Sequence, residues 1–185
     1  MRTRPLTENE INLLKSSTEL LVHQCMIEFL YRSGYRISEM LGMKLKDIVN
    51  EKGDVKSYVN VPQNRMKGKE AARSIPIHES ARKLIAEYLK VRQSDNPFLW
   101  LTPLGNTVRR QHFHYTLKEA AIKAGIEPDR VASHSFRKTF AKGIFERSGN
   151  SLQLTQKALG HKAITSTIAY LEVDTNMVDS LIRDY

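Results

Sequence analysis

The sequence contains only one cysteine, Cys25, among its 185 residues, so no disulfide can form within the chain. It has no apolar run that approaches the roughly 18–20 residues needed to cross a bilayer, and no hydrophobic segment of the secretory type. These absences predict a reducing, cytoplasmic environment and no membrane partner. Internal repeats and low-complexity segments are also missing, which argues against a solenoid and against a disordered chain.

Acidic residues are the minority among the charged ones. The chain has 20 Asp and Glu against 29 Lys and Arg, for a net charge of +9. An excess of this size favours a polyanionic partner, with nucleic acid ahead of a membrane surface. The basic residues are spread along the chain without a polybasic tail, which predicts a folded binding face. A hydrophobic content of 41% is sufficient for the core of one sizeable domain.

Helical periodicity dominates the chain and predicts a mainly α fold with one small antiparallel β-hairpin, an α+β class. Thr7 and Glu10 have the spacing of a capping box, so a first helix should begin there. The apolar stripe over residues 19–33 should end at Gly34, a suitable left-handed cap. Further helices are expected over residues 37–45, 77–93, 107–124, 134–147, 151–159, 163–171 and 174–184.

Two β-rich segments stand near the middle of the chain. Residues 54–61, "DVKSYVNV", and residues 73–77, "RSIPI", show partial alternation and flank a basic loop. They predict a hairpin in which Pro76 keeps the second strand at an edge. Residues 94–108, "SDNPFLWLTPLGNTV", are the strongest candidate for a boundary between parts of the chain, although they are too apolar for a free linker.

His134 and Arg137 lie three residues apart in "SHSFR", and Ser133 is a suitable N-cap for the helix that carries them. In a first helical turn, free amides and the helix dipole favour an anion. Arginine offers a planar fork for two phosphate oxygens, and histidine can donate a hydrogen bond or transfer a proton near neutral pH. The pair therefore suggests a phosphate site, and its alternative is a chance pair on a surface helix.

The segment "LGHKAITSTIAY" combines an imidazole and a phenol. Gly160 should end a short helix, with His161 just beyond it and Tyr170 in the next helix. Tyrosine is a weak nucleophile at its usual pKa of about 10, but it can attack phosphorus where nearby cations stabilise the phenolate. The alternative is a turn histidine and a tyrosine at the rim of an amphipathic helix.

Two further sets of residues could serve such a reaction. Arg36 lies in the turn that follows Gly34, and Glu39 is spaced to orient its guanidinium; the alternative is an ordinary surface ion pair. In the hairpin loop, Lys67 or Lys69 could act as a general acid toward a leaving oxygen. The alternative for these lysines is a solvated loop.

In order and spacing, these residues resemble the tyrosine recombinases, also called the phage integrase family. The resemblance extends from "PLTENEINLL" to "TIAYLEV" and implies the catalytic-domain fold of that family. It assigns six catalytic positions, namely Arg36, Lys67, His134, Arg137, His161 and the nucleophile Tyr170. Glu39 matches the acidic residue that accompanies the first arginine. Alignment of Lys67 requires one inserted residue, so Lys69 stays open as the general acid.

The resemblance implies a site-specific recombinase. A tyrosine attacks a DNA phosphodiester, forms a 3′-phosphotyrosyl link and frees a 5′-hydroxyl, and a partner strand then attacks that link. The outcome is integration, excision or inversion without a metal or nucleotide cofactor, and no Asp, Glu and His cluster in the sequence has metal-ligand spacing. The sequence does not define the DNA target.

The family's roles can be carried over to individual residues. Arg36 and Arg137 are expected to clamp the non-bridging phosphate oxygens, and His161 to donate a hydrogen bond to the same phosphate. His134 is expected either to deprotonate Tyr170 or to position the phosphate, and the sequence leaves both roles open.

Duplex DNA is the partner that the resemblance implies, bound by a homotetramer whose subunits can be monomers in solution and can exchange the C-terminal helix over residues 174–184. Residues 107–123 are the candidate DNA-facing element, and a solvated basic face is the alternative. The individual DNA-binding candidates are Arg65, Lys69, Arg109, Arg110, Gln111 and Lys138. Lys138 stands where the family often has a histidine.

Full-length relatives generally carry a separate N-terminal core-binding domain. Here the resemblance begins at the start of the chain, so residues 1–185 are expected to form a single catalytic domain without that core-binding domain. An excised fragment and a short form, like the fimbrial phase-variation recombinases, both fit this expectation. Two other functions stay open: a type IB topoisomerase, and a non-catalytic DNA-binding derivative, against which the six filled catalytic positions argue.

Overall fold

The computed structural model describes residues 3–61 and 73–171 and divides the chain into two compact units, Met1–Phe140 and Ala141–Tyr185. The division falls inside helix α7 (Ser133–Arg147) and not in residues 94–108, the candidate boundary of the sequence. That segment belongs to the first unit because Trp100 is almost fully buried and its indole N–H donates to the Met40 carbonyl at 2.8 Å.

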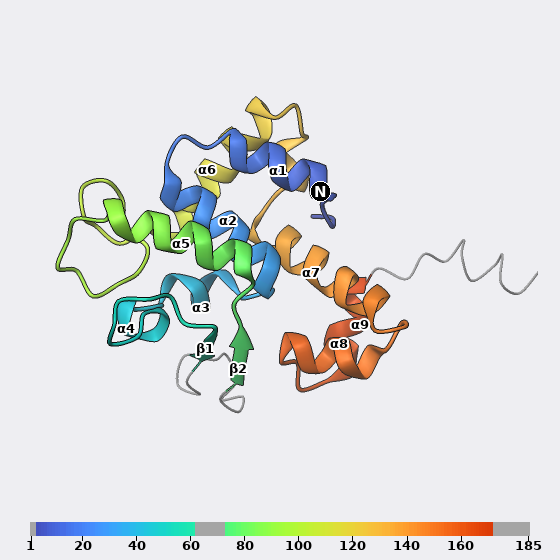
Figure 1. Ribbon diagram of the computed structural model, residues 1–185. Coiled ribbons are helices and arrows are strands. Elements are labelled where there is room, and N and C mark those ends of the chain that lie inside the picture. The colour runs from blue at the N-terminus through green and yellow to red at the C-terminus, as the bar shows by residue number, and fades with distance from the viewer. Residues whose placement is uncertain (1–2, 62–72, 172–185) are drawn as a thin grey trace, which may run out of the picture. The chain divides into compact units, whose positions relative to one another are not determined.

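The first unit is mainly helical, as expected, and its elements are seen in Figure 1. Before the beginning of α7 it contains α1 (Glu8–Ser16), α2 (Leu21–Ser33), α3 (Ile37–Leu41), α4 (Leu45–Ile48), α5 (Glu79–Val91), α6 (Arg110–Lys123) and the 3₁₀ helix Pro128–Arg130. The helix expected over 37–45 is split into α3 and α4. Residues 43–45 instead bond to residues 97–99, through Leu99 N–H to Met43 and Leu45 N–H to Pro97.

Two predicted caps are confirmed. The Thr7 hydroxyl accepts a hydrogen bond from Glu10 N–H at 3.2 Å, and the Glu10 carboxylate accepts one from Thr7 N–H at 2.9 Å. Gly34 ends α2 with φ of 62° and donates its N–H to the Leu30 carbonyl at 3.0 Å. A glycine is favoured there because side chains crowd the backbone in the left-handed region.

The predicted hairpin is also confirmed. Strand β1 (Tyr58–Val61) pairs antiparallel with β2 (Arg73–Pro76), and Val59 stands opposite Ile75. Both of these side chains are buried, whereas Tyr58 is exposed, as the two-residue alternation of a half-buried strand requires. The first strand is shorter than expected because Val55 forms an isolated bridge with Val49.

Helix α2 is the centre of the first unit's core. Its residues Cys25, Met26, Ile27 and Leu30 are fully buried, and α5 and α1 pack against it (Figure 1). Phe29 from the same helix lies 5.9 Å from Trp100, ring centroid to centroid. This packed core supports the turn in which α2 ends.

One buried residue of α2 is a histidine. The His23 ring is 5% exposed and meets the ring of His112 on α6 edge-on at 5.3 Å. Burial, and then the neighbouring His112, lower the pKa of His23 to about 4. His23 is therefore neutral in the folded protein near neutral pH.

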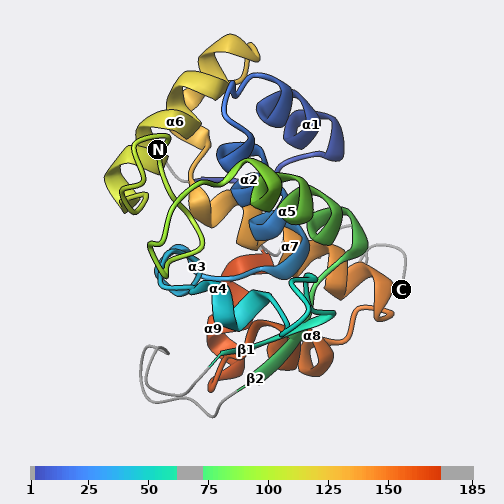
Figure 2. The same ribbon diagram turned by 60° about the vertical axis from the view of Figure 1, so that its left-hand side comes forward.

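The second unit contains the end of α7, α8 (Leu152–Leu159) and α9 (Ile164–Leu171), and α9 packs against α8 (Figure 2). The Ser151 hydroxyl caps α8 by accepting from Leu154 N–H at 3.3 Å, and Gly160 ends α8 in the left-handed conformation. The helix expected over 174–184 lies outside the described residues. Within residues 3–61 and 73–171, no helix is both long and apolar enough to span a membrane.

Candidate active site

Arg36 lies in the short connection between α2 and α3, where Glu39 holds it at two points. One carboxylate oxygen of Glu39 accepts from the Arg36 backbone N–H at 3.0 Å, and the other pairs with the guanidinium Nη1 at 2.8 Å. The Glu39 side chain is 1% exposed and that of Arg36 is 20% exposed. The predicted ion pair is therefore present and largely shielded from solvent, unlike an ordinary surface pair.

Arg137, on α7, is joined to the same connection. Its side chain is fully buried, and its guanidinium donates to the carbonyl oxygen of Gly34, two residues before Arg36. The ring of Phe140, one turn along α7, lies against Gly34 so closely that a Cβ there would be 2.3 Å from it. The structure thus brings both predicted arginines to the turn that ends α2.

His134 lies on α7 three residues before Arg137, and it is partly exposed. Its pKa is lowered, first by partial burial of the ring and then by the positive charges of Arg137 and Arg110. Lys138 and Arg36 add to this positive field. A histidine in such surroundings is neutral near neutral pH, and an anion beside it is stabilised electrostatically.

The helix that carries this pair begins one residue earlier than expected. Ser133 is the first residue of α7 and not its N-cap, so that prediction is wrong. The Ser135 side chain accepts from Ala132 N–H at 3.2 Å and donates to the Arg130 carbonyl at 3.0 Å. These bonds hold the entry turn without help from Ser133.

A pocket of about 480 Å³ opens beside His134. From the first turns of α6 it is lined by Arg110, Gln111 and His114, and Phe113 is among its apolar lining residues. Two of the predicted DNA-binding residues therefore share a pocket with a predicted catalytic one. Arg109, just before α6, is exposed.

Lys138 has a different setting from the other DNA-binding candidates. Its side chain is buried, and its ammonium donates to the carbonyl of Thr3. The lysine therefore ties the segment before α1 to α7. Arg65, Lys67 and Lys69 lie outside the described residues.

In the second unit, His161 and Tyr170 lie side by side. Their ring centroids are 5.3 Å apart and the rings are tilted by 44°. Gly160 ends α8 with φ of 66°, so His161 follows the helix as predicted. The Nδ1 atom of His161 lies 3.0 Å from the hydroxyl of Thr167. The close relation of imidazole and phenol expected from the sequence is present.

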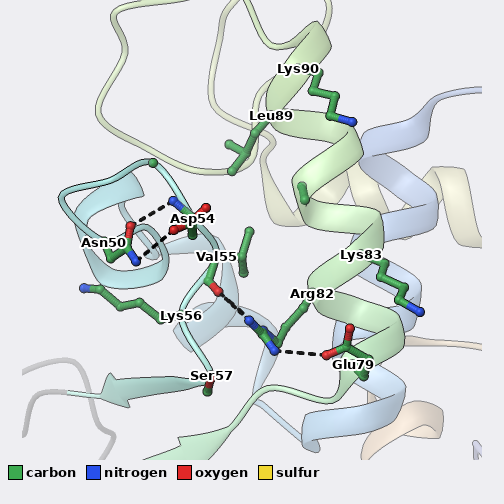
Figure 3. A pocket seen from close by; sticks show the side chains of 12 residues that line it. Asn50, Asp54, Val55, Lys56, Ser57, Glu79, Arg82, Lys83, Leu89 and Lys90 are labelled. Atoms are coloured by element: carbon green, nitrogen blue, oxygen red, sulfur yellow. Dashed lines mark hydrogen bonds and ion pairs between the residues drawn. The ribbon is translucent and has the colours of Figure 1, made fainter.

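A second pocket has no predicted site residue in its walls. It has a volume of about 910 Å³ and lies between residues 50–57 and α5 (Figure 3). The Arg82 guanidinium donates to the Val55 carbonyl at 3.1 Å and pairs with Glu79 at 3.0 Å. The bond to Val55 connects the two walls, and the ion pair with Glu79, which lies on the same helix as Arg82, orients the guanidinium.

The sequence prediction missed two groups, the Gly34 carbonyl and Thr167. The bond from Arg137 to Gly34 spans 103 residues, and no local pattern indicates it. Thr167 had a usable signal, because it precedes Tyr170 by three residues and therefore lies on the same side of α9. Among the described residues, no group of three or more His, Cys, Asp and Glu side chains could hold a metal ion.

Residues 4–177 match the sequence model of the phage integrase family. The chain belongs to this family. Among its curated members, the tyrosine recombinase XerD of Rickettsia conorii is 35% identical over 173 residues, which are 87% of this chain and 55% of the relative. The tyrosine recombinase XerC of Erythrobacter litoralis is 30% identical over 160 residues, which are 86% of this chain and 49% of the relative. The chain thus spans about half the length of these phage integrase relatives.

Solved structures of recombinases share the fold. The XerA recombinase has a TM-score of 0.75 at 21% identity over 97% of this chain and 62% of its own. The XerH recombinase, in a post-cleavage complex with its palindromic difH substrate, has a TM-score of 0.75 at 20% identity over 96% of this chain and 51% of its own. The predicted family and the predicted α+β fold are both confirmed.

Proposed function

We propose that this chain contains the catalytic region of a site-specific DNA recombinase in which Tyr170 is the nucleophile. Membership of the phage integrase family supports this, as does the similarity to curated tyrosine recombinases. The observation that carries the proposal is the contact between the Tyr170 and His161 rings. A phenol beside an imidazole on a shared two-helix element is suited to attack on a phosphate that the imidazole also binds.

In the proposed reaction, the phenolic oxygen of Tyr170 attacks a DNA phosphorus and the bond from phosphorus to the 5′-oxygen breaks. The products are a 3′-phosphotyrosyl link and a 5′-hydroxyl, whose proton comes from Lys67 or Lys69. The 5′-hydroxyl of a partner strand then attacks the link, forms a new phosphodiester and releases Tyr170. Because one phosphodiester replaces another, the two steps require no nucleotide cofactor.

The arginines are proposed to neutralise the charge that builds on the non-bridging oxygens during attack. Arg36 is oriented by Glu39 before any ligand binds, and Arg137 is fixed by the Gly34 carbonyl. Groups that are held in place act strongly on a transition state because they need no reorganisation. The lowered pKa of His134 leaves it able to accept a proton near neutral pH, so a role as base toward the tyrosine fits as well as a positioning role.

Duplex DNA is the proposed partner. The net charge of +9 supports phosphate binding, and Arg109, Arg110 and Gln111 are exposed at the start of α6. The buried Lys138 gives no such support. The homotetramer with exchanged helices stays a prediction because residues 174–184 lie outside the described part of the chain.

The direct test is the covalent adduct. The wild-type chain, mixed with nicked DNA fragments from the genome that encodes it, should form a covalent protein–DNA species that survives denaturing electrophoresis. Tyr170→Phe should abolish it while leaving DNA binding, measured by fluorescence anisotropy, within about twofold, because only the attacking oxygen is lost. Tyr31→Phe is the matched control, since Tyr31 belongs to α2 in the first unit. An adduct that survives Tyr170→Phe refutes the nucleophile.

The same preparation separates the rival functions. Exchange of label between two duplexes identifies a recombinase, whereas relaxation of supercoiled DNA without exchange identifies topoisomerase activity. Binding of DNA without any adduct from the wild-type chain identifies a non-catalytic derivative.

A further inference from the structure

Thr167 is the buried polar residue on α9. Its side chain is fully buried, whereas Thr165, Ser166 and Ile168 on the same helix are exposed. A buried hydroxyl is expected to be hydrogen-bonded, and its hydrogen-bonding neighbour is Nδ1 of His161 at 3.0 Å. Threonine is a modest helix former, so helix propensity alone does not account for it at this position.

His161 is held from two sides. The Gln156 side-chain amide donates to the carbonyls of His161 and Lys162, both at 3.0 Å, and the Gln156 carbonyl accepts from His161 N–H at 3.1 Å. These bonds fix the backbone of His161 but leave rotation about its side-chain bonds open. The Thr167 hydroxyl contacts the ring itself and so limits that rotation.

The hydroxyl also bears on which ring nitrogen carries the proton. When the Thr167 O–H donates to Nδ1, the single proton of a neutral imidazole must be on Nε2. The opposite nitrogen is then a hydrogen-bond donor. The hydroxyl can also accept from Nδ1–H, in a protonated ring or in the other neutral form, so the 3.0 Å contact is compatible with either direction of the bond.

We propose that Thr167 is a positioning residue for His161, which fixes the ring beside Tyr170 and selects the neutral form protonated at Nε2. This role of Thr167 in the reaction rests on the proposed function, because Nε2–H of His161 is the donor expected to bind the phosphate under attack. Thr167 lies three residues before Tyr170 on α9. One helix therefore carries both the nucleophile and the group that orients its neighbouring imidazole.

Nitrogen-15 NMR of the histidine rings tests the tautomer directly, at a pH where His161 is neutral. The wild-type chain should show His161 protonated at Nε2, and Thr167→Ser, which retains the hydroxyl, should do the same. Thr167→Val, of similar shape but without the hydroxyl, should show a mixture of tautomers. Thr165→Val makes the same chemical change on the exposed side of α9 and should leave His161 unaltered.

The adduct assay gives the second measurement. Thr167→Val should slow adduct formation about tenfold, since one oriented hydrogen bond is lost, with DNA affinity within about twofold. Thr167→Ser should recover most of the rate. A rate and tautomer in Thr167→Val equal to those of the wild type overturn the proposal.

The two proposals fail separately. If the wild-type chain forms no adduct but the tautomer depends on the Thr167 hydroxyl, the positioning role stands and the recombinase function fails. If the Thr167→Val chain does not fold, Thr167→Ala, which also lacks the hydroxyl, replaces it in both measurements. A neutral His161 protonated at Nδ1 in the wild-type chain overturns the positioning role.

Discussion

The two units of this chain differ in how much apolar side chain each one buries in its own interior. The first encloses large side chains completely, among them Phe113, Phe136 and Leu30. In the described part of the second, residues 141–171, the buried apolar side chains are Ala141 and Leu159, and Leu154 is 55% exposed. The arginines thus stand on a packed scaffold, whereas the tyrosine stands on a small element ordered by caps and polar contacts.

This difference matters because packing and hydrogen bonds position groups in different ways. A packed core resists displacement in every direction, since filled space has few alternative arrangements. Hydrogen bonds act along particular directions and exchange readily with water at an exposed surface. We therefore expect Arg36 and Arg137 to keep their geometry under conditions that loosen α8 and α9.

The largest effect is expected from a matched pair of leucines. Leu30→Ala in the first unit should cost roughly 3–4 kcal/mol of unfolding free energy, in the middle of the range for buried leucines. Leu159→Ala in the second should cost less, about 2 kcal/mol, at the low end of that range, because Leu159 is buried outside the hydrophobic core that contains Leu30. Urea unfolding followed by Trp100, the only tryptophan of the chain, reports on the first unit. Hydrogen exchange of α8 and α9 amides reports on the second.

Leu30→Ala should shift the Trp100 transition strongly. Leu159→Ala should leave it nearly unchanged and accelerate exchange in α8 and α9. Equal losses of stability for both variants would remove the proposed difference between the units.

A smaller effect is expected at the turn that joins the two arginines. Gly34→Ala should cost roughly 2–3 kcal/mol, because left-handed backbone disfavours a side chain by about 1–2 kcal/mol and the new Cβ meets the Phe140 ring. Gly53→Ala is the control, since Gly53 also has a positive φ, of 87°, but has nothing within 4 Å of the new Cβ. Urea unfolding of both variants measures the difference. If they lose the same stability, Phe140 does not restrict the turn.

The smallest effect concerns acid. The folded-state pKa of His23, about 4, lies below its ordinary value, so the unfolded chain binds its proton first as the pH falls. The first unit should therefore lose roughly 1 kcal/mol from this group between about pH 7 and about pH 5.5. His23→Gln should remove that part of the pH dependence, whereas His114→Gln, at an exposed position, should not. An unchanged slope for His23→Gln would show that the buried imidazole does not titrate as described.

Local features were the ones that the sequence predicted well. The capping box at Thr7, the glycine caps at Gly34 and Gly160 and the Arg36–Glu39 pair depend on residues at most four positions apart. Such contacts follow from helix geometry alone. The proximity of His161 and Tyr170 also follows, because a rigid turn and two helical turns separate them.

The features that the sequence did not predict depend on contacts distant in the chain. Lysine is usually a surface residue. Lys138 is buried, however, and its ammonium donates to the carbonyl of Thr3, 135 positions earlier. The turn-rich composition of residues 94–108 suggested a boundary. It does not show that Trp100, within this segment, is buried in the core of the first unit. Neither burial nor a distant carbonyl partner leaves a periodic signal.

The double contact of Glu39 with Arg36 has a thermodynamic consequence. Arginine has one of the most flexible side chains, and immobilising it on a ligand costs up to about 2 kcal/mol of conformational entropy. Here the carboxylate restrains both the backbone and the guanidinium of Arg36 in the ligand-free protein. Most of that entropy is lost when the chain folds, so an arriving anion meets a cation whose orientation is already set.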